Sequence, residues 1–206
     1  MTFPDRLAIA SRNPHKLREI VRICAGWPVS WVTGEQHDAG WPDVDEPYDT
    51  YRANALHKAR SVASALGVAA LAADSGIEVD ALGGAPGPRS ARFAGNHASD
   101  AENLGKLIRE IVEAPVELRS ARYRCVAVVA WTDERSLEAE GTCEGTLITE
   151  PRGDRGFGYD PVFVPDGSTK TMAELPDDEK DAISHRGRAL SQLGRLLAEA
   201  DRGAAN

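Results

Sequence analysis

The sequence predicts an α/β protein with a central, twisted, mixed β-sheet, flanking helices and two lobes around a cleft. Short apolar runs and amphipathic segments alternate in the first part of the 206-residue chain, which is typical of this fold class. Residues 122–131 and 137–148 look like two long strands of a hairpin, and such an antiparallel pair makes the sheet mixed. The sequence contains no internal repeat or linker, so we expect a single domain over residues 1–206.

The first elements are a strand, a helix and a second strand. The apolar run at residues 7–10 predicts a buried strand that opens into a loop. Pro14 suits the first position of a helix, and apolar residues recur on one helical face after it, so residues 14–25 are expected to be helical. Residues 29–32 predict the second strand, and residues 33–49 predict a loop with a surplus of carboxylates.

A second helix and a third strand follow the acidic loop. Asp49 or Thr50 can cap a helix whose small and apolar residues form one stripe, and this helix ends near Gly67. Residues 68–72 predict a strand that ends at the polar residues beginning with Asp74.

The rest of the chain alternates between irregular and regular segments. Residues 83–95 are too rich in Gly, Pro and Ser for regular structure. Residues 100–111 are expected to form a helix, and the last part of the chain another. Asp133 and Glu134 are expected at the turn of the hairpin.

Composition and charge exclude several classes of partner. The chain has 24 Lys and Arg against 32 Asp and Glu, and the net charge of -8 would repel nucleic acid but still permit a small nucleotide. The apolar runs are far shorter than the roughly 20 residues that span a bilayer. No secretory signal is recognisable, so we expect a cytoplasmic protein without membrane contacts. The three widely spaced cysteines indicate neither a disulfide framework nor a zinc site.

The segment SRNPHK at residues 11–16 lies where a strand gives way to a helix. Main-chain N–H groups at a helix start favour an anion, and Ser11, Asn13 and Lys16 add further donors, so this segment is a candidate phosphate site. It lacks the glycines of a Walker loop. The alternative is a helix capped by Ser or Asn beside a solvated lysine.

Carboxylates occur in two separate segments that flank the second predicted helix. Oxygen ligands from both segments would bind Mg²⁺, which also keeps several waters. The alternative is an acidic surface in contact with solvent. The residues concerned are Asp43, Asp45, Glu46 and Asp49 in the loop, and Asp74 after the third strand.

The segment GFGYDP at residues 156–161 combines aromatic rings with two glycines. Phe157 and Tyr159 can stack on a flat base, and Asp160 can accept hydrogen bonds. The alternative is an aromatic turn that packs on the core.

Three cations cluster around a helix start near the end of the chain. Ser184 is a good cap residue, and Lys180, His185 and Arg186 beside it suit a base carbonyl or a phosphate. The alternative is an ordinary charged helix start.

Taken together and in order, five segments of the chain resemble the inosine triphosphate pyrophosphatase family. The resemblance spans nearly the whole sequence, and the order and spacing carry it because no single motif is decisive. The segments are SRNPHK at residues 11–16, TYRANALHKA at 50–59, ADSGIEVDALGGAPGPRSARFAG at 73–95, GFGYDPVF at 156–163 and SHRGRAL at 184–190.

The resemblance implies an elongated α/β fold with a cleft, a homodimer, Mg²⁺ as cofactor and a purine nucleoside triphosphate as substrate. Family members remove pyrophosphate from inosine, deoxyinosine and xanthosine triphosphates. The resemblance also implies site residues. The phosphate ligands would be Ser11, Arg12, Asn13, Pro14, His15, Lys16 and Lys58. Asp74 would be the proton acceptor and a metal ligand, Asp45 or Glu46 would be further metal ligands, and Ser75 would contact the substrate. The base and sugar ligands would be Phe157, Gly158, Tyr159, Asp160, Lys180, His185 and Arg186.

The sequence departs from the family at two places near the expected metal. Ala73 stands where the family has a first aspartate before the Ser-Gly, and Ala53 stands where a Glu commonly precedes the Asn. The Glu-Thr-Gly segment is also replaced, by residues 45–48. This loss of carboxylates leaves one alternative open, a nucleotide-binding protein with little hydrolysis. A separate alternative is a pyrophosphatase for other modified nucleotides.

Overall fold

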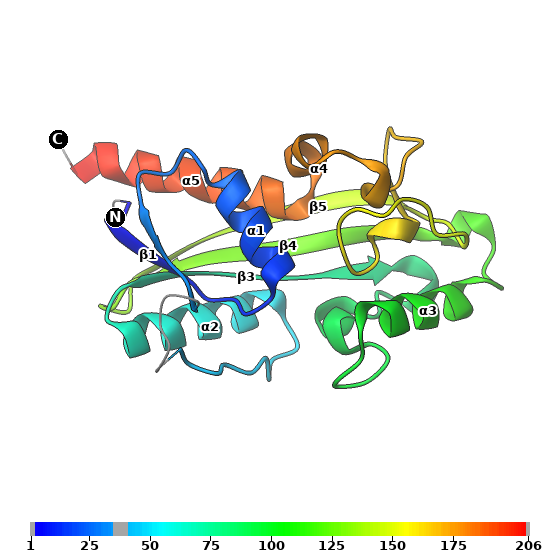
Figure 1. Ribbon diagram of the computed structural model, residues 1–206, viewed down its shortest axis with the longest axis horizontal. Helices are drawn as coiled ribbons and strands as arrows, with labels where there is room; N and C mark the ends of the chain where they lie inside the picture. Colours follow the sequence, from blue (N-terminus) through cyan, green and yellow to red (C-terminus); the bar gives the residue numbers. More distant parts are fainter. Residues whose placement is uncertain (1–2, 35–40, 205–206) are drawn as a thin grey trace. The chain divides into compact units, whose positions relative to one another are not determined.

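The computed structural model describes residues 3–34 and 41–204 of the chain. Its strands are β1 (Arg6–Ile9), β2 (Ser30–Val32), β3 (Ala69–Val79), β4 (Ser120–Ala130), β5 (Ser136–Leu147) and β6 (Phe163–Pro165). They form one sheet in the order β2-β1-β3-β4-β5-β6 (Figure 1). β1 pairs in parallel with β2 and β3, whereas β5 and β6 are antiparallel. The predicted mixed sheet is therefore confirmed.

Most helices begin and end at the residues that the sequence indicates. The helices are α1 (Pro14–Ile23), α2 (Tyr51–Leu66), α3 (Asp100–Ile111), α4 (Asp177–Ile183) and α5 (His185–Ala204). Thr50, rather than Asp49, caps α2 through a hydrogen bond from the Ala53 N–H, and Gly67 ends this helix with φ 65°. The short helix α4 was not expected from the sequence. Within the described ranges, no helix combines the length and apolar character that crossing a membrane requires.

Two predicted irregular segments have different outcomes. Residues 41–50 of the acidic loop lack helix and strand, as expected, whereas residues 35–40 lie outside the described part of the chain. The prediction for residues 83–95 is wrong in part, because Gly87–Arg92 forms a 3-10 helix. Ser90 explains this helix: its hydroxyl donates to the Gly87 carbonyl at 2.6 Å and accepts from the Ile77 N–H at 2.9 Å.

The chain divides into two compact units, in agreement with the two predicted lobes. Unit 1 comprises residues 1–74, 125–141 and 186–206, and unit 2 comprises residues 75–124 and 142–185. β3, β4 and β5 contribute residues to both units. Each unit has an apolar core of its own.

In unit 1, strand side chains alternate between two helical layers. Leu7 and Ile9 of β1 pack in a core with α1 and α5, whereas Ala8 and Ala10 pack with α2. Figure 1 shows α1 and α5 on one face of these strands and α2 on the other. This alternation follows from the two-residue period of a strand. Ala73 of β3 lies in the α1 and α5 core, so its neighbour Asp74 faces α2.

In unit 2, one core joins the sheet to α3. Ile77 and Val79 of β3 are fully buried, as are Leu107 and Ile111 of α3. The prediction that the third strand ends before Asp74 is therefore wrong. The apolar alternation resumes after two polar residues, and the burial of Ile77 and Val79 carries the strand forward. Asp74 consequently lies inside an 11-residue strand rather than at its end.

Candidate active site

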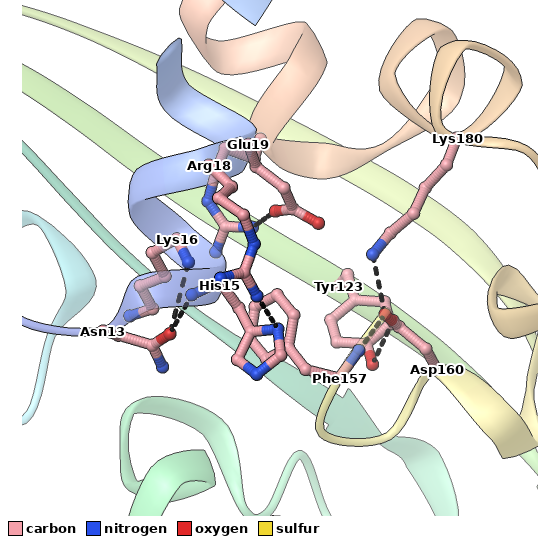
Figure 2. Close-up of polar contacts among 10 residues, drawn as sticks. Asn13, His15, Lys16, Arg18, Glu19, Tyr123, Phe157, Asp160 and Lys180 are labelled. Atoms are coloured by element: carbon pink, nitrogen blue, oxygen red, sulfur yellow. Dashed lines mark hydrogen bonds and ion pairs between the residues drawn. The ribbon is translucent and has the colours of Figure 1, made fainter. Parts of the chain in front are cut away.

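The N-terminus of α1 is capped by the side chain of Asn13. Its Oδ1 accepts hydrogen bonds from the N–H groups of His15 and Lys16 at 2.9 and 3.2 Å (Figure 2). Pro14 has no N–H, and the Asn13 N–H donates to Ser11 Oγ at 3.2 Å. The expectation that main-chain N–H groups at the start of α1 would bind an anion is thus wrong, because Asn13 already accepts their hydrogen bonds. Any attraction for phosphate must come from side chains, above all from Lys16.

Lys16 belongs to a group of close charges in unit 1. Burial lowers the pKa of its ammonium group, and Lys58 lowers it further, whereas Asp74 acts in the opposite direction. Lys58 forms an ion pair with Glu46, in which the side chains are 12% and 20% exposed. We call Lys16, Glu46, Lys58 and Asp74 the unit 1 charge group. It concentrates two cations and two carboxylates in a partly dehydrated region, where electrostatic interactions are strong.

Asp74 is the most deeply buried carboxylate of this group, with 2% of the residue exposed. Burial raises the pKa of its carboxyl group and Glu46 raises it further, whereas Lys16, Lys58 and a hydrogen bond from Asn54 lower it in part. A carboxylate with a raised pKa is a better proton acceptor than an exposed one. The group thus combines a carboxylate suited to accept a proton with two nearby lysines.

Asn54 organises this group, although the sequence pattern did not single it out as a site residue. It is fully buried in α2, and its Nδ2 donates to Asp74 Oδ2 at 3.2 Å and to the Tyr48 carbonyl at 3.0 Å. Its Oδ1 accepts from the Tyr48 N–H at 2.9 Å. Asn54 therefore ties the loop that carries Glu46 to Asp74. The signal was a polar residue on the apolar stripe of the helix.

The three predicted metal ligands do not all lie together. Glu46 is close enough to Asp74 to raise its pKa. The Asp45 side chain is 83% exposed and lies 3.6 Å from Nε2 of His57. Among the described residues, no group of three or more His, Cys, Asp or Glu is placed to hold a metal ion.

Two other predicted phosphate ligands point to local partners. Arg12 donates to Asp43 at 3.1 Å and to the Trp41 carbonyl at 3.2 Å, and its side chain is 58% exposed. His15 Nδ1 lies 2.9 Å from a guanidinium nitrogen of Arg18 (Figure 2).

In unit 2, a network of polar contacts surrounds the buried Asp160. Its Oδ2 accepts from Lys180 Nζ at 2.7 Å and from the Phe157 N–H at 3.0 Å, and its Oδ1 accepts from the Tyr123 hydroxyl at 3.2 Å (Figure 2). Gly156, with φ 71°, lets the main chain lie close to the Asp160 carboxylate, because a Cβ atom there would collide with Asp160 Oδ2. Asp160 thus accepts hydrogen bonds from other residues of the chain, and its contact with a base stays a prediction.

The two aromatic residues of this segment differ in their surroundings. Phe157 is half-buried, with Lys180 Nζ 5.4 Å from its ring centroid. Tyr159 is buried in the unit 2 core, and its hydroxyl donates to the Ser90 carbonyl at 2.7 Å. Tyr159 thus follows the core-packing alternative. Gly158 donates its N–H to Asp100 at 3.0 Å, which anchors the turn to the first residue of α3.

His185 and Arg186 begin α5, directly after Ser184. His185 is buried, and its ring stacks on Tyr123 with a centroid distance of 4.6 Å and an interplanar angle of 8°. In unit 1, Arg186 forms a buried ion pair with Glu19 of α1. Sequence reasoning missed Tyr123 and Glu19, because both act through contacts with residues far away in the chain.

Ser75 follows Asp74 in β3 and is half-buried. Because consecutive residues of a strand point to opposite faces, its side chain points away from the face that Asp74 occupies.

The fold and the unit 1 charge group define an α/β protein in which a buried carboxylate lies close to two lysines, a combination suited to an anionic substrate and to proton transfer. The model of the Ham1 family matches residues 7–196, and the chain belongs to this family.

Several known proteins are similar to the chain over most of its length. The dITP/XTP pyrophosphatase of Geobacter sulfurreducens is 44% identical over 188 residues, which cover 91% of this chain and 94% of that protein. The dITP/XTP pyrophosphatase of Bacillus subtilis is 41% identical over 96% of this chain and 99% of its own. The structure of a HAM1 protein from Coxiella burnetii matches with a TM-score of 0.84 and 38% identity, over 97% of this chain and 100% of that one. The resemblance predicted from the five sequence segments is confirmed.

Proposed function

We propose that this chain hydrolyses dITP, ITP, XTP and dXTP to the nucleoside monophosphate and pyrophosphate, and so removes these triphosphates from the nucleotide pool. Membership of the Ham1 family and identities of 41–49% to dITP/XTP pyrophosphatases support this assignment. The observation that carries it is the unit 1 charge group, in which the buried Asp74 lies within electrostatic reach of Lys16 and Lys58.

The proposed reaction assigns Asp74 as the proton acceptor. A water molecule attacks the α-phosphorus, the new O–P bond forms, and the bond from the α-phosphorus to the bridging oxygen breaks. Asp74 takes the proton from this water. Lys16 and Lys58 stabilise the negative charge of the departing pyrophosphate. Ser11, Asn13 and Ser75 add hydrogen bonds to the bound substrate.

The cofactor in this proposal is Mg²⁺. The fit rests on Glu46 and Asp74: the charge of Glu46 raises the pKa of Asp74, so two carboxylates repel each other in a buried region, and a divalent cation would offset this repulsion. Two carboxylates suffice for Mg²⁺, which keeps waters and binds phosphate oxygens. Asp45, exposed beside His57, fits this role less well. When bound, the ion would screen the phosphate charge and lower the pKa of a coordinated water.

The base is assigned to residues of the Asp160 network and of the α5 start. Lys180, His185 and Arg186 are the hydrogen-bond donors for the 6-oxo group of hypoxanthine or xanthine. Adenine presents an amino group at this position, which would leave a buried donor unpaired at a cost of about 1–3 kcal/mol. Phe157 offers its ring to the base, and Gly158, Tyr159 and Asp160 shape the turn that presents it.

The proposal also covers organisation and location. We assign one pyrophosphatase domain to residues 1–206. We further propose a homodimer, and a cytoplasmic location because the nucleoside triphosphate pool is found there.

A substrate panel with product analysis tests the proposed function. Purified chain is incubated with ITP, dITP, XTP, dGTP, dTTP and UTP, with and without Mg²⁺, and the products are separated by ion-exchange chromatography. The expected result is monophosphate plus pyrophosphate from the inosine and xanthosine substrates, at kcat/KM values about 10-fold or more above those for the others. Tight binding of ITP without pyrophosphate release would instead indicate a binding protein. A preference for another nucleotide would indicate a different pyrophosphatase.

A further inference from the structure

Tyr123 of β4 contacts two residues of the proposed base site, yet it lies outside all five segments that carry the family resemblance. The residue is 7% exposed and belongs to the unit 2 core. Its hydroxyl donates to Asp160 Oδ1 at 3.2 Å (Figure 2). Its ring stacks on that of His185 with a centroid distance of 4.6 Å. One side chain thus combines a polar and an apolar contact to different base-site residues.

The hydroxyl contact restrains the carboxylate of Asp160. Tyr123 binds Oδ1, whereas Lys180 and the Phe157 N–H bind Oδ2. Because both oxygens are engaged by donors from three separate segments, rotation of the carboxylate would break at least one contact. Lys180 Nζ is held by Asp160, so the direction of its other N–H donors depends on how firmly Tyr123 fixes that carboxylate.

The ring contact restrains the imidazole of His185. The two rings are nearly parallel, at 8°, and their spacing gives an extended stacked surface. Phe163 packs against the same tyrosine ring at 4.7 Å and 57°, which limits its movement. The plane of His185, and hence the direction of its ring nitrogens, is set by Tyr123.

We propose that Tyr123 is a positioning residue that sets the base selectivity of this chain, an inference that rests on the proposed pyrophosphatase function. Its hydroxyl aligns the Asp160–Lys180 pair and its ring aligns His185, so that both donors meet the 6-oxo edge of the base. Tyr123 itself need not touch the substrate. Misaligned donors would lose the hydrogen bond to a 6-oxo group, whereas the contacts that all nucleotides share would remain. The selectivity for 6-oxo bases would therefore fall.

Two substitutions separate the contacts. Tyr123→Phe keeps the stack on His185 and removes the hydroxyl, whereas Tyr123→Leu removes both. The measured quantity is the ratio of kcat/KM for ITP to kcat/KM for ATP. We expect this ratio to fall about 5-fold in Tyr123→Phe, the scale of one lost hydrogen bond, and about 20-fold or more in Tyr123→Leu. The same ratio, measured as the Kd of IMP against that of AMP by calorimetry, should fall in parallel.

Ile111→Ala provides a matched control. Ile111 is fully buried in the same core, so its truncation lowers the melting temperature without changing a base-site contact. It should leave the ITP to ATP ratio unchanged. Tyr123→Phe, the milder change, remains decisive if Tyr123→Leu does not fold.

The outcomes are distinguishable. If the wild-type chain prefers ITP to ATP and both Tyr123 variants keep that preference undiminished, the positioning role alone is overturned. A wild-type chain that neither hydrolyses nor prefers ITP would overturn the proposed function, and this proposal with it.

Discussion

Asp74 in unit 1 and Asp160 in unit 2 are both almost fully buried, at 2% and 4% exposed, but their surroundings differ. Asp160 accepts hydrogen bonds on both oxygens, from a lysine, a tyrosine and a main-chain N–H. Around Asp74 the largest effect is burial, which raises the pKa of its carboxyl group despite nearby Lys16. A carboxylate held by directional donors orients other groups, whereas one with a raised pKa is suited to accept a proton. This difference supports the proposed roles of Asp160 in base recognition and of Asp74 in proton transfer.

Asp74→Asn should have the largest effect. We expect kcat to fall about 10²- to 10⁴-fold, since the proton acceptor is lost. The stability of the fold should instead increase. Because the pKa is raised, the folded chain binds a proton at Asp74 more readily than the unfolded chain, and the ionised carboxylate destabilises the fold above its usual pKa. The variant should therefore melt at a higher temperature at pH 7.5, and this gain should disappear at a pH below the usual carboxyl pKa.

Asp5→Asn is the control for that prediction, because Asp5 is an exposed carboxylate of unit 1. It should alter neither kcat nor the melting temperature. Full turnover in Asp74→Asn would remove the catalytic assignment, and a lower melting temperature at pH 7.5 would contradict the electrostatic explanation.

Asn54→Ala tests whether the unit 1 charge group depends on its amide link. We expect the free energy of unfolding to fall by about 1–3 kcal/mol, because the buried partners of Asn54 lose their hydrogen bonds. We also expect kcat to fall about 10-fold, since Asp74 and the loop carrying Glu46 are no longer tied together. Denaturant melts and steady-state kinetics measure the two quantities.

Asn103→Ala is a close match for this substitution. Asn103 is a buried asparagine of unit 2 whose amide bonds the Ala94 N–H and the Ala91 carbonyl at 2.8 and 3.1 Å. Asn103→Ala should lower the free energy of unfolding by a similar amount and leave kcat nearly unchanged. Equal losses of kcat in both variants would reduce Asn54 to a structural residue.

Gly156→Ala should affect stability and have a smaller effect on kcat than the two preceding variants. Its φ of 71° is strained for alanine, and the added Cβ would meet Asp160 Oδ2. Gly167 has φ 80°, and a Cβ added there would meet no atom within 4 Å, so Gly167→Ala carries the backbone strain alone, about 1–2 kcal/mol. Gly156→Ala should cost about 2–5 kcal/mol in thermal or denaturant unfolding. Equal losses of unfolding free energy in the two variants would mean that the Asp160 network rearranges around the added Cβ without loss of stability.

Local signals explain which parts of the fold could be predicted from the sequence. The caps of α1, α2 and α3 are short-range, and these helices begin where the sequence indicates. The full length of β3 could not be predicted, because Asp74 and Ser75 interrupt its apolar run and only the unit 2 core explains its continuation.

The site was predictable where residue type alone suffices. Asp160 as an acceptor and the lysines as cations follow from their chemistry. Whether Tyr159 faces a ligand or the core does not, since its hydroxyl partner Ser90 is 69 residues away. The Glu19 to Arg186 ion pair joins residues 167 apart. Such contacts depend on how the strands are ordered in the sheet, which no local pattern specifies.

Hydrolysis of dITP in ¹⁸O-labelled water tests the central claim most directly, because it reports which phosphorus the water attacks. If Asp74 serves a water at the α-phosphorus while Lys16 and Lys58 hold the leaving pyrophosphate, the label enters the nucleoside monophosphate and none enters pyrophosphate. Mass spectrometry of the two products measures this. Label in the pyrophosphate, or release of a diphosphate and inorganic phosphate, would contradict it.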